Sequence, residues 1–353
     1  MNPDKNLSEL LEIVINQGGS DMHIVAGGPP MVRVSGALIA LTQYPSFTGE
    51  QTEAMLKSIV PQGRWDMFMT VRSIDLSFAL RPDQRFRVNG YIVQGTVALA
   101  IRLIPPATRT FSELNLPPVL ETFTQHKQGF FLVVGPVGQG KSTTLAVMID
   151  SINESRAEHI LTIEDPVEYL FTPKKSLIQQ REVYVDVPDF KSALQSSFRE
   201  DVDVLMVGEM RDYETISAAV TAAETGHLVL STLHTNSAAQ TIDRIIDMFP
   251  AEQQGQVRVQ LAGSLMGIFS QRLIPRISGG LIPAFELLIN NNAVSTLIRE
   301  ARTHEISSVI QTSSQEGMID LDRSLAELVR RGEVTVEHAY EYALQPKTFE
   351  TYL

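Results

Sequence analysis

The sequence predicts an α/β protein in which a small α+β domain precedes a larger domain with a doubly wound sheet and a helical C-terminal part. Two observations predict this fold class. From Phe111 onward, short apolar runs alternate with helical stretches, as strands and helices do around a mainly parallel sheet. Before residue 105, two runs alternate apolar and polar residues instead, which is typical of half-buried antiparallel strands.

The first domain is expected over residues 1–108. Its first helix is predicted by apolar residues spaced i, i+3, i+4 and i+7, namely Leu7, Leu10, Leu11 and Val14. Strand-like runs follow at residues 31–36, 74–80, 86–93 and 97–104. A helical stretch near residues 49–69 separates the first of these runs from the second. Pro105 and Pro106 end the region, and the sequence PPATRT is typical of a linker.

The second domain is expected over residues 109–275. Four apolar runs predict its strands, at residues 130–135, 159–165, 203–209 and 227–235. After Pro275 the pattern becomes helical, so residues 276–353 are expected to form a helical C-terminal part. There the spacing of Leu321, Leu325 and Leu328 predicts one helix, Gly332 breaks the chain, and Thr335 is placed to cap a last helix.

Composition and charge narrow the function classes. The net charge is −12 and no run is rich in lysine and arginine, which argues against tight, sequence-independent binding of nucleic acid. Cysteine is absent, so disulfides and cysteine-based zinc sites are excluded and a reducing compartment fits. The first residues lack the pattern of a secretory signal peptide, and no window approaches 18 uninterrupted apolar residues, so we expect no membrane-spanning helix.

The strongest motif is GPVGQGKS at residues 135–142, which fits the pattern G-x-x-x-x-G-K-[ST] of a phosphate-binding P-loop. An apolar run precedes it and a helical stretch follows it, which is the context that the motif requires. Glycines let backbone N–H groups approach phosphate oxygens, and the helix N-terminus adds partial positive charge. Lys141 is expected to reach the β- and γ-phosphates of ATP, and the Ser142 hydroxyl to bind Mg²⁺. The predicted nucleotide-binding residues are Gly135, Pro136, Val137, Gly138, Gln139, Gly140, Lys141, Ser142 and Thr143.

Two acidic strand ends follow the P-loop along the chain. The first, in ILTIEDPVEY, contains Glu164, Asp165 and Glu168, which could hold Mg²⁺ through its waters or orient the attacking water. The alternative is a solvated acidic turn broken by a proline. The second, VLMVGEMRD, resembles a Walker B strand with Glu209 as its acid and a glycine in place of the usual aspartate. We therefore expect Glu209 to polarise water, and Mg²⁺ binding to depend on Ser142 and Glu164.

Two histidines bracket the fourth apolar run. His227 and His234 are seven residues apart, so on a strand they face opposite sides and are not expected to bind one metal. Taken alone, each would more often be a hydrogen-bonded histidine at a strand end. Thr232, His234 and Thr235 end the strand beside the expected nucleotide, however, where a sensor of the γ-phosphate would lie.

Taken together, the boxes GPVGQGKSTT, ILTIEDPVEY, VGEMRDYETI and AETGHLVLSTLHT resemble the secretion ATPase superfamily, which drives type II secretion and type IV pili. The resemblance is strongest to the pilus retraction ATPases of the PilT/PilU type and covers nearly the whole chain, including GGSDMHIVAGGPPMVRVSG, FRVNGY, IRLIPP and TIDRIIDMFPAEQQ. It implies a PAS-like N-terminal domain joined to a RecA-like P-loop ATPase domain. It also implies the use of ATP and Mg²⁺, and a homohexamer that holds ATP between subunits.

The resemblance further implies catalytic roles and partners. Arg87 and Arg102 match arginines of the N-terminal domain that reach the phosphates, and with Glu209, Glu164 and His234 they complete the expected catalytic set. The alternative for both arginines is an exposed strand face. The motor would be cytoplasmic, peripheral at the inner face of the cytoplasmic membrane. Its partners would be an inner-membrane pilus platform protein and a paralogous pilus ATPase, and not nucleic acid.

One segment departs from the family. Retraction ATPases often carry AIRNLIRE in the C-terminal region, whereas residues 293–300 read AVSTLIRE here. The leading prediction is a hexameric ATP-hydrolysing motor that powers pilus retraction and twitching motility. An accessory PilU-like subunit with weak turnover is an alternative. A RecA-like nucleic-acid translocase is another, although no basic patch with interleaved aromatic residues supports it.

Overall fold

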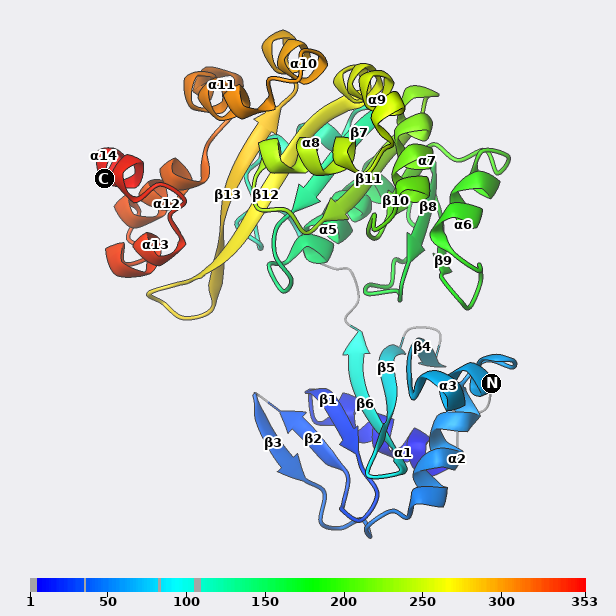
Figure 1. The fold of residues 1–353 in the computed structure, drawn as a ribbon. Helices are drawn as coiled ribbons and strands as arrows, with labels where there is room; N and C mark the ends of the chain where they lie inside the picture. The colour runs from blue at the N-terminus through cyan, green and yellow to red at the C-terminus, as the bar shows by residue number, and fades with distance from the viewer. Residues whose placement is uncertain (1–4, 35, 82–83, 105–108) are drawn as a thin grey trace. The chain divides into compact units, whose positions relative to one another are not determined.

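The computed structural model describes residues 5–34, 36–81, 84–104 and 109–353, which form two compact units (Figure 1). The first unit contains the described residues up to Ile104 and two later segments, Asp165–Phe171 and Glu182–Asp186. The remaining described residues form the second unit. The predicted linker at residues 105–108 lies outside the described residues, so the predicted domain boundary there stays a prediction.

The first unit is built on a six-stranded antiparallel sheet with the strand order β3-β2-β1-β6-β5-β4. Its strands are β1 (Gly19–Ile24), β2 (Met31–Val34), β3 (Ala37–Ala40), β4 (Ser73–Arg81), β5 (Gln84–Val93) and β6 (Thr96–Ile104). Helix α1 (Lys5–Asn16) buries the four residues whose spacing predicts it, Leu7, Leu10, Leu11 and Val14.

The helical stretch predicted near residues 49–69 is two helices, α2 (Gly49–Ile59) and α3 (Arg64–Val71). The break has a local cause. Val60 is extended, as the residue before a proline prefers, and Gly63 takes a left-handed conformation with φ +90°. The chain therefore turns between the helices instead of continuing one of them.

The second unit is built on a seven-stranded mixed sheet with the order β13-β12-β7-β11-β10-β8-β9. Its strands are β7 (Gly129–Val134), β8 (His159–Glu164), β9 (Leu177–Glu182), β10 (Val204–Val207), β11 (Leu228–Leu233), β12 (Leu265–Pro275) and β13 (Leu281–Ile289). Strands β12, β7, β11, β10 and β8 run parallel, so their carboxyl ends meet at one edge. Helix α4 (Val119–Thr124) precedes β7, and the helices between the later strands are α5 (Lys141–Ser155), α6 (Phe190–Ser197), α7 (Tyr213–Glu224), α8 (Ala238–Asp247) and α9 (Ala251–Ser264). These two units confirm the predicted α/β fold class.

The region after Pro275 differs from the helical pattern expected there. Strand β13 pairs with β12 in a long antiparallel hairpin at one edge of the sheet (Figure 1). Gly279 and Gly280, both with positive φ, make the turn that the hairpin requires. The helices begin only at Asn292 and are α10 (Asn292–Arg299), α11 (Ile306–Thr312), α12 (Leu321–Arg330), α13 (Val336–Tyr342) and α14 (Pro346–Tyr352).

Two predicted details of this C-terminal region are confirmed. Leu321, Leu325 and Leu328 are buried on α12, and the Thr335 side chain caps α13 by accepting a hydrogen bond from the His338 backbone N–H. Among the helices within the described ranges, none has both the length and the apolar character needed to cross a membrane.

Candidate nucleotide-binding site

The P-loop connects the buried strand β7 to helix α5, at the carboxyl edge of the parallel strands. Its glycines are required by geometry. Gly135 has φ +145°, and a Cβ atom placed on it would lie 2.5 Å from the Gln271 backbone oxygen. Gly140 has φ +79°, and a Cβ atom there would lie 2.8 Å from Gln271 Nε2. The loop can therefore keep this path only with bare backbone at both positions, which leaves its N–H groups accessible to an anion.

Strand β12 holds the loop in place through side-chain hydrogen bonds. The Gln271 amide donates to the Gln139 carbonyl at 2.7 Å and accepts from the Thr144 hydroxyl at 2.7 Å. The Leu273 backbone N–H donates to Gln139 Oε1 at 2.6 Å. Sequence reasoning missed Gln271, because nothing local shows that a strand 130 residues later lies beside β7.

The Lys141 ammonium is buried inside the loop, where Nζ donates to the Pro136 carbonyl at 2.8 Å and lies 3.3 Å from His234 Nδ1. The predicted lysine and the predicted γ-phosphate sensor are therefore neighbours. This follows from the topology, since β11 pairs with β7 and His234 comes directly after β11.

Glu209 lies next to the same histidine. Glu209 Oε2 is 3.6 Å from His234 Nε2, and the Glu209 carboxylate forms an ion pair with Arg211. When His234 Nδ1 accepts from Lys141, the ring proton is on Nε2 and faces Glu209. The structure thus brings together a cation, an imidazole and a carboxylate at adjacent strand ends, which is a set suited to phosphate binding and water activation.

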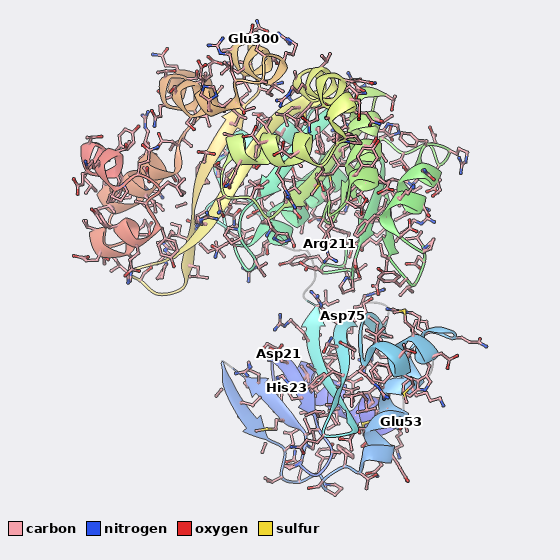
Figure 2. All side chains as sticks on the ribbon, viewed as in Figure 1. Asp21, His23, Glu53, Asp75, Arg211 and Glu300 are labelled. Atoms are coloured by element: carbon pink, nitrogen blue, oxygen red, sulfur yellow. The ribbon has the colours of Figure 1, made fainter. Side chains whose placement is uncertain are left out.

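Arg211 is a site residue that sequence reasoning did not single out. It belongs to the box VGEMRD, follows the end of β10 by four residues and is labelled in Figure 2. In the sequence, Arg211 is marked only by its charge, close after Glu209. A charged residue after a strand is common, so the sequence alone does not identify Arg211 as part of a site.

Glu164 lies deeper than a solvated acidic turn would place it. Its side chain is buried at the end of β8, where it accepts from the Thr162 hydroxyl at 2.7 Å and from Gln180 Nε2 at 3.1 Å. Strand β10 separates β8 from β11, so Glu164 is one strand further from the P-loop than Glu209 is. Ser142, its expected partner at Mg²⁺, is partly buried and follows Lys141 in the first turn of α5.

The two histidines occupy opposite ends of β11. His227 precedes the strand, contacts the Ala222 carbonyl at 3.0 Å and meets the ring of Phe198 edge-on. His227 therefore lies at the amino end of β11, away from the carboxyl edge of the sheet that carries the P-loop.

Arg87 and Arg102 belong to the first unit and lie opposite each other on β5 and β6. Arg87 Nη1 is 3.5 Å from Glu168 Oε1, and Arg102 Nε donates to Asp21 Oδ1 at 2.8 Å. Both guanidinium groups reach solvent, so their predicted contact with phosphate stays a prediction.

The loop has the features that binding of a nucleotide phosphate requires. Two glycines leave no room for a side chain, a lysine ammonium is fixed inside the loop, and the helix N-terminus follows. Within the described ranges, no group of three or more His, Cys, Asp and Glu side chains is arranged to hold a metal ion. A magnesium ion here would thus take most of its ligands from phosphate oxygens and water, as it commonly does with nucleotides.

Comparison with known proteins gives a consistent result. The model of the type II/IV secretion system protein family matches residues 74–281. The type IV pilus retraction ATPase PilT of Pseudomonas aeruginosa is 44% identical over 98% of this chain and 100% of its own length. The type IV pilus ATPase PilU of the same organism is 38% identical over 95% of this chain and 88% of its own.

Solved structures agree with the sequence relatives. A crystal structure of the pilus retraction motor PilT with bound ADP superposes with a TM-score of 0.89, at 44% identity and 98% coverage of both chains. The ATPase DotB of Legionella pneumophila superposes with a TM-score of 0.86, at 25% identity and 97% coverage of both chains.

Proposed function

Because the chain belongs to the type II/IV secretion system protein family, we propose that it hydrolyses ATP to power the retraction of type IV pili. The observation that carries the proposal is the cluster of Lys141, His234 and Glu209 at the P-loop, in a chain that matches a retraction motor over 98% of its length. The PilT structure holds ADP, the product of ATP hydrolysis, which supports binding of an adenine nucleotide here.

In this proposal each residue of the cluster has one task. Lys141 exchanges its contacts with the Pro136 carbonyl and His234 for the β- and γ-phosphates of ATP. Glu209 orients the attacking water by accepting its hydrogen bond, and His234 reports the γ-phosphate because it lies between Lys141 and Glu209. A magnesium ion, when bound, neutralises charge that develops on the phosphate oxygens. The Ser142 hydroxyl and the Glu164 carboxylate are the residues that would hold it, Glu164 through water.

The assembly and its surroundings belong to the proposal as well. By the family resemblance we infer a homohexamer with ATP between subunits, in which Arg87 and Arg102 reach the phosphates. The ring would work in the cytoplasm at the inner face of the cytoplasmic membrane. It would act on an inner-membrane pilus platform protein, with a paralogous pilus ATPase as a further partner.

A second candidate is an accessory motor subunit of the PilU type. Two observations favour it: the 38% identity to PilU, and the segment AVSTLIRE, in which Ser295 and Thr296 replace the usual Arg-Asn pair. Steady-state ATP hydrolysis by the purified protein separates the two candidates, since a retraction motor turns over ATP by itself and the accessory subunit does so weakly.

Twitching motility in a deletion strain tests the function itself. Loss of twitching with pili still on the surface, restored by the wild-type chain but not by a Lys141→Ala chain, is the expected result. Normal twitching in the deletion strain would contradict the role in retraction. Loss of surface pili would instead indicate a motor for pilus extension.

A further inference from the structure

The motif GGSDMHI, at residues 18–24, contributes no residue to the candidate nucleotide-binding site. Most of it forms β1, in the middle of the first unit's sheet, where Asp21 and His23 are two residues apart and thus lie on one face (both labelled in Figure 2). Asp21 lies opposite Arg33 of β2 on one side and opposite Arg102 of β6 on the other. Aspartate is disfavoured inside strands. We therefore expect the neighbouring arginines to stabilise Asp21 at this position.

Both carboxylate oxygens of Asp21 are engaged. Oδ1 accepts from Arg102 Nε at 2.8 Å, and Oδ2 accepts from the Ser20 hydroxyl at 2.8 Å. Burial raises the pKa of Asp21, but the hydrogen bonds from Arg102 and Ser20 outweigh it and lower that pKa below its usual value. The group is therefore a carboxylate at neutral pH, and it is held from two sides.

The backbone around Asp21 is shaped for this contact. The β1–β2 register shifts between Gly19 and Asp21, so the strand bulges at Ser20. Gly19 cannot be larger, because a Cβ atom there would lie 2.8 Å from Val32 Cγ2 and 3.2 Å from the Arg33 carbonyl. The bulge sets the Ser20 hydroxyl against Asp21, which fixes the carboxylate.

Of the two arginines opposite Asp21, Arg102 forms the hydrogen bond with its carboxylate and Arg33 bonds elsewhere. The Arg33 guanidinium donates to the Gly36 carbonyl at 2.8 Å. Arg102 is held at Nε alone; its side chain is 70% exposed, whereas that of Asp21 is 14% exposed. Within the part of the chain that the structure describes, neither terminal nitrogen of Arg102 has a hydrogen-bond partner. Two such nitrogens form the fork that matches a pair of phosphate oxygens.

We propose that Asp21 is a positioning residue that fixes the Arg102 guanidinium by Nε, so that its terminal nitrogens present a ready fork to a phosphate of the bound nucleotide. The inference rests on the proposed function, in which Arg102 reaches those phosphates. Fixing a long side chain in advance lowers the entropy that it loses when the phosphate is engaged. Asp21 then acts on hydrolysis only through Arg102.

The alternative is a purely structural task. Arg87 and Arg102 lie directly opposite each other, and like charges in such a pair destabilise a sheet. Asp21 would then offset their repulsion and contribute to stability without affecting turnover. The two tasks differ in their effect on kcat, which a set of variants can measure.

The test is a double-mutant cycle on steady-state ATP hydrolysis by the full-length protein with Mg²⁺. We expect Asp21→Ala to lower kcat about tenfold to a hundredfold, the range that a misplaced contact group costs, with KM for ATP changed less. Arg102→Ala should lower kcat at least as much, and the Asp21→Ala, Arg102→Ala double variant should equal Arg102→Ala. Asp21→Asn keeps an oxygen for Nε and should recover part of the loss. Arg33→Ala, which removes the arginine on the other side of Asp21, should retain wild-type turnover.

The outcomes separate this inference from the proposed function. Low turnover in Arg102→Ala with wild-type turnover in Asp21→Ala would overturn the inference alone, as would losses that add in the double variant. Wild-type turnover in Arg102→Ala would overturn the role of that arginine and the inference with it. Urea unfolding of each variant identifies a folding defect; if Asp21→Ala unfolds, Asp21→Asn completes the cycle in its place.

Discussion

At the scale of single residues, the site depends on three polar groups that three different strand ends bring together. Lys141 Nζ lies 3.3 Å from His234 Nδ1, and His234 Nε2 lies 3.6 Å from Glu209 Oε2. The imidazole of His234 links the two charged groups, because one ring nitrogen faces Lys141 and the other faces Glu209. A change in the position of Lys141 can therefore alter the hydrogen bonding at Glu209. Binding of a γ-phosphate at Lys141 would thus affect Glu209, the carboxylate that we propose orients water.

Lys141→Ala should abolish ATP hydrolysis and leave the fold intact. The ammonium is the only charge of the P-loop itself, and the contacts that the variant loses include those with the Pro136 carbonyl and with a nitrogen of His234. Turnover and circular dichroism of the purified variant measure the two effects. Lys127→Ala, an exposed lysine just before β7, is the matched control and should behave as wild type. Near wild-type turnover in Lys141→Ala would contradict the P-loop assignment.

Glu209→Gln should bind ATP but hydrolyse it slowly. The substitution keeps the size of the side chain and removes the negative charge that we propose orients water, a loss that typically costs about 10²–10⁴ in rate. Nucleotide binding by fluorescence and turnover under saturating ATP separate the two steps. Glu214→Gln, on the surface of α7, provides the control. If ATP binding itself disappears in Glu209→Gln, the residue holds the metal or the loop and does not activate water.

At the scale of secondary-structure elements, a buried carboxylate ties β13 to the start of α8. Glu286 Oε1 accepts from the Ala238 backbone N–H at 2.7 Å, which satisfies one of the unpaired donors at the first turn of that helix. Burial raises the pKa of Glu286 to about 7, with help from the charges of Asp320 and Asp322, while the Ala238 hydrogen bond and Arg272 oppose the shift. Because α8 begins four residues after His234, this contact supports the loop that carries the histidine.

The raised pKa gives a testable pH dependence of stability. The pKa of Glu286 is about 7 in the folded chain, and its ordinary value of 4.5 applies in the unfolded chain. Between pH 4.5 and 7 the folded state therefore holds a proton that the unfolded state has lost. Stability must then fall as pH rises through this window, by on the order of a few kcal/mol. Glu286→Gln should flatten this slope in urea unfolding measured from pH 4.5 to 8. The remaining slope includes Asp322, whose pKa burial also raises. An unchanged slope in Glu286→Gln would contradict the assignment.

How far the sequence predicts these elements depends on how local their cause is. The period of Leu7, Leu10, Leu11 and Val14 is contained within α1, and the glycines of the P-loop shape their own turn, so both are predictable. Strand β13 is not, since its apolar residues favour a strand only once β12 pairs with it. Gln271 supports the P-loop only because β12 packs beside β7. Long-range pairing of this kind leaves no periodicity in the chain.

At the scale of the whole molecule, hydrolysis must be coupled to movement of the pilus, and α10 is our candidate for that coupling. Val294, Leu297 and Ile298 are buried and anchor the helix to its own unit. The departure at Ser295 has a structural explanation, since its hydroxyl contacts the Ala262 carbonyl and Asn290 Oδ1 at 3.0 Å each and fastens α10 to α9. The outer end of the helix, at Glu300, faces solvent (Figure 2).

Replacing Arg299 and Glu300 by alanine should leave most ATP hydrolysis but eliminate retraction in cells. The two side chains do not pair with each other: Arg299 donates to the Thr296 hydroxyl at 3.1 Å, and Arg302 donates to Glu300 at 2.8 Å. Such exposed contacts are worth about 0–1 kcal/mol, so the fold should tolerate their loss. The control is the double alanine variant of Arg323 and Glu327, an exposed ion pair on α12. Twitching and turnover are measured for both. Normal twitching in the Arg299, Glu300 variant would mean that these two side chains have no role in coupling. Equal loss of hydrolysis and twitching would indicate a defect in ring assembly instead.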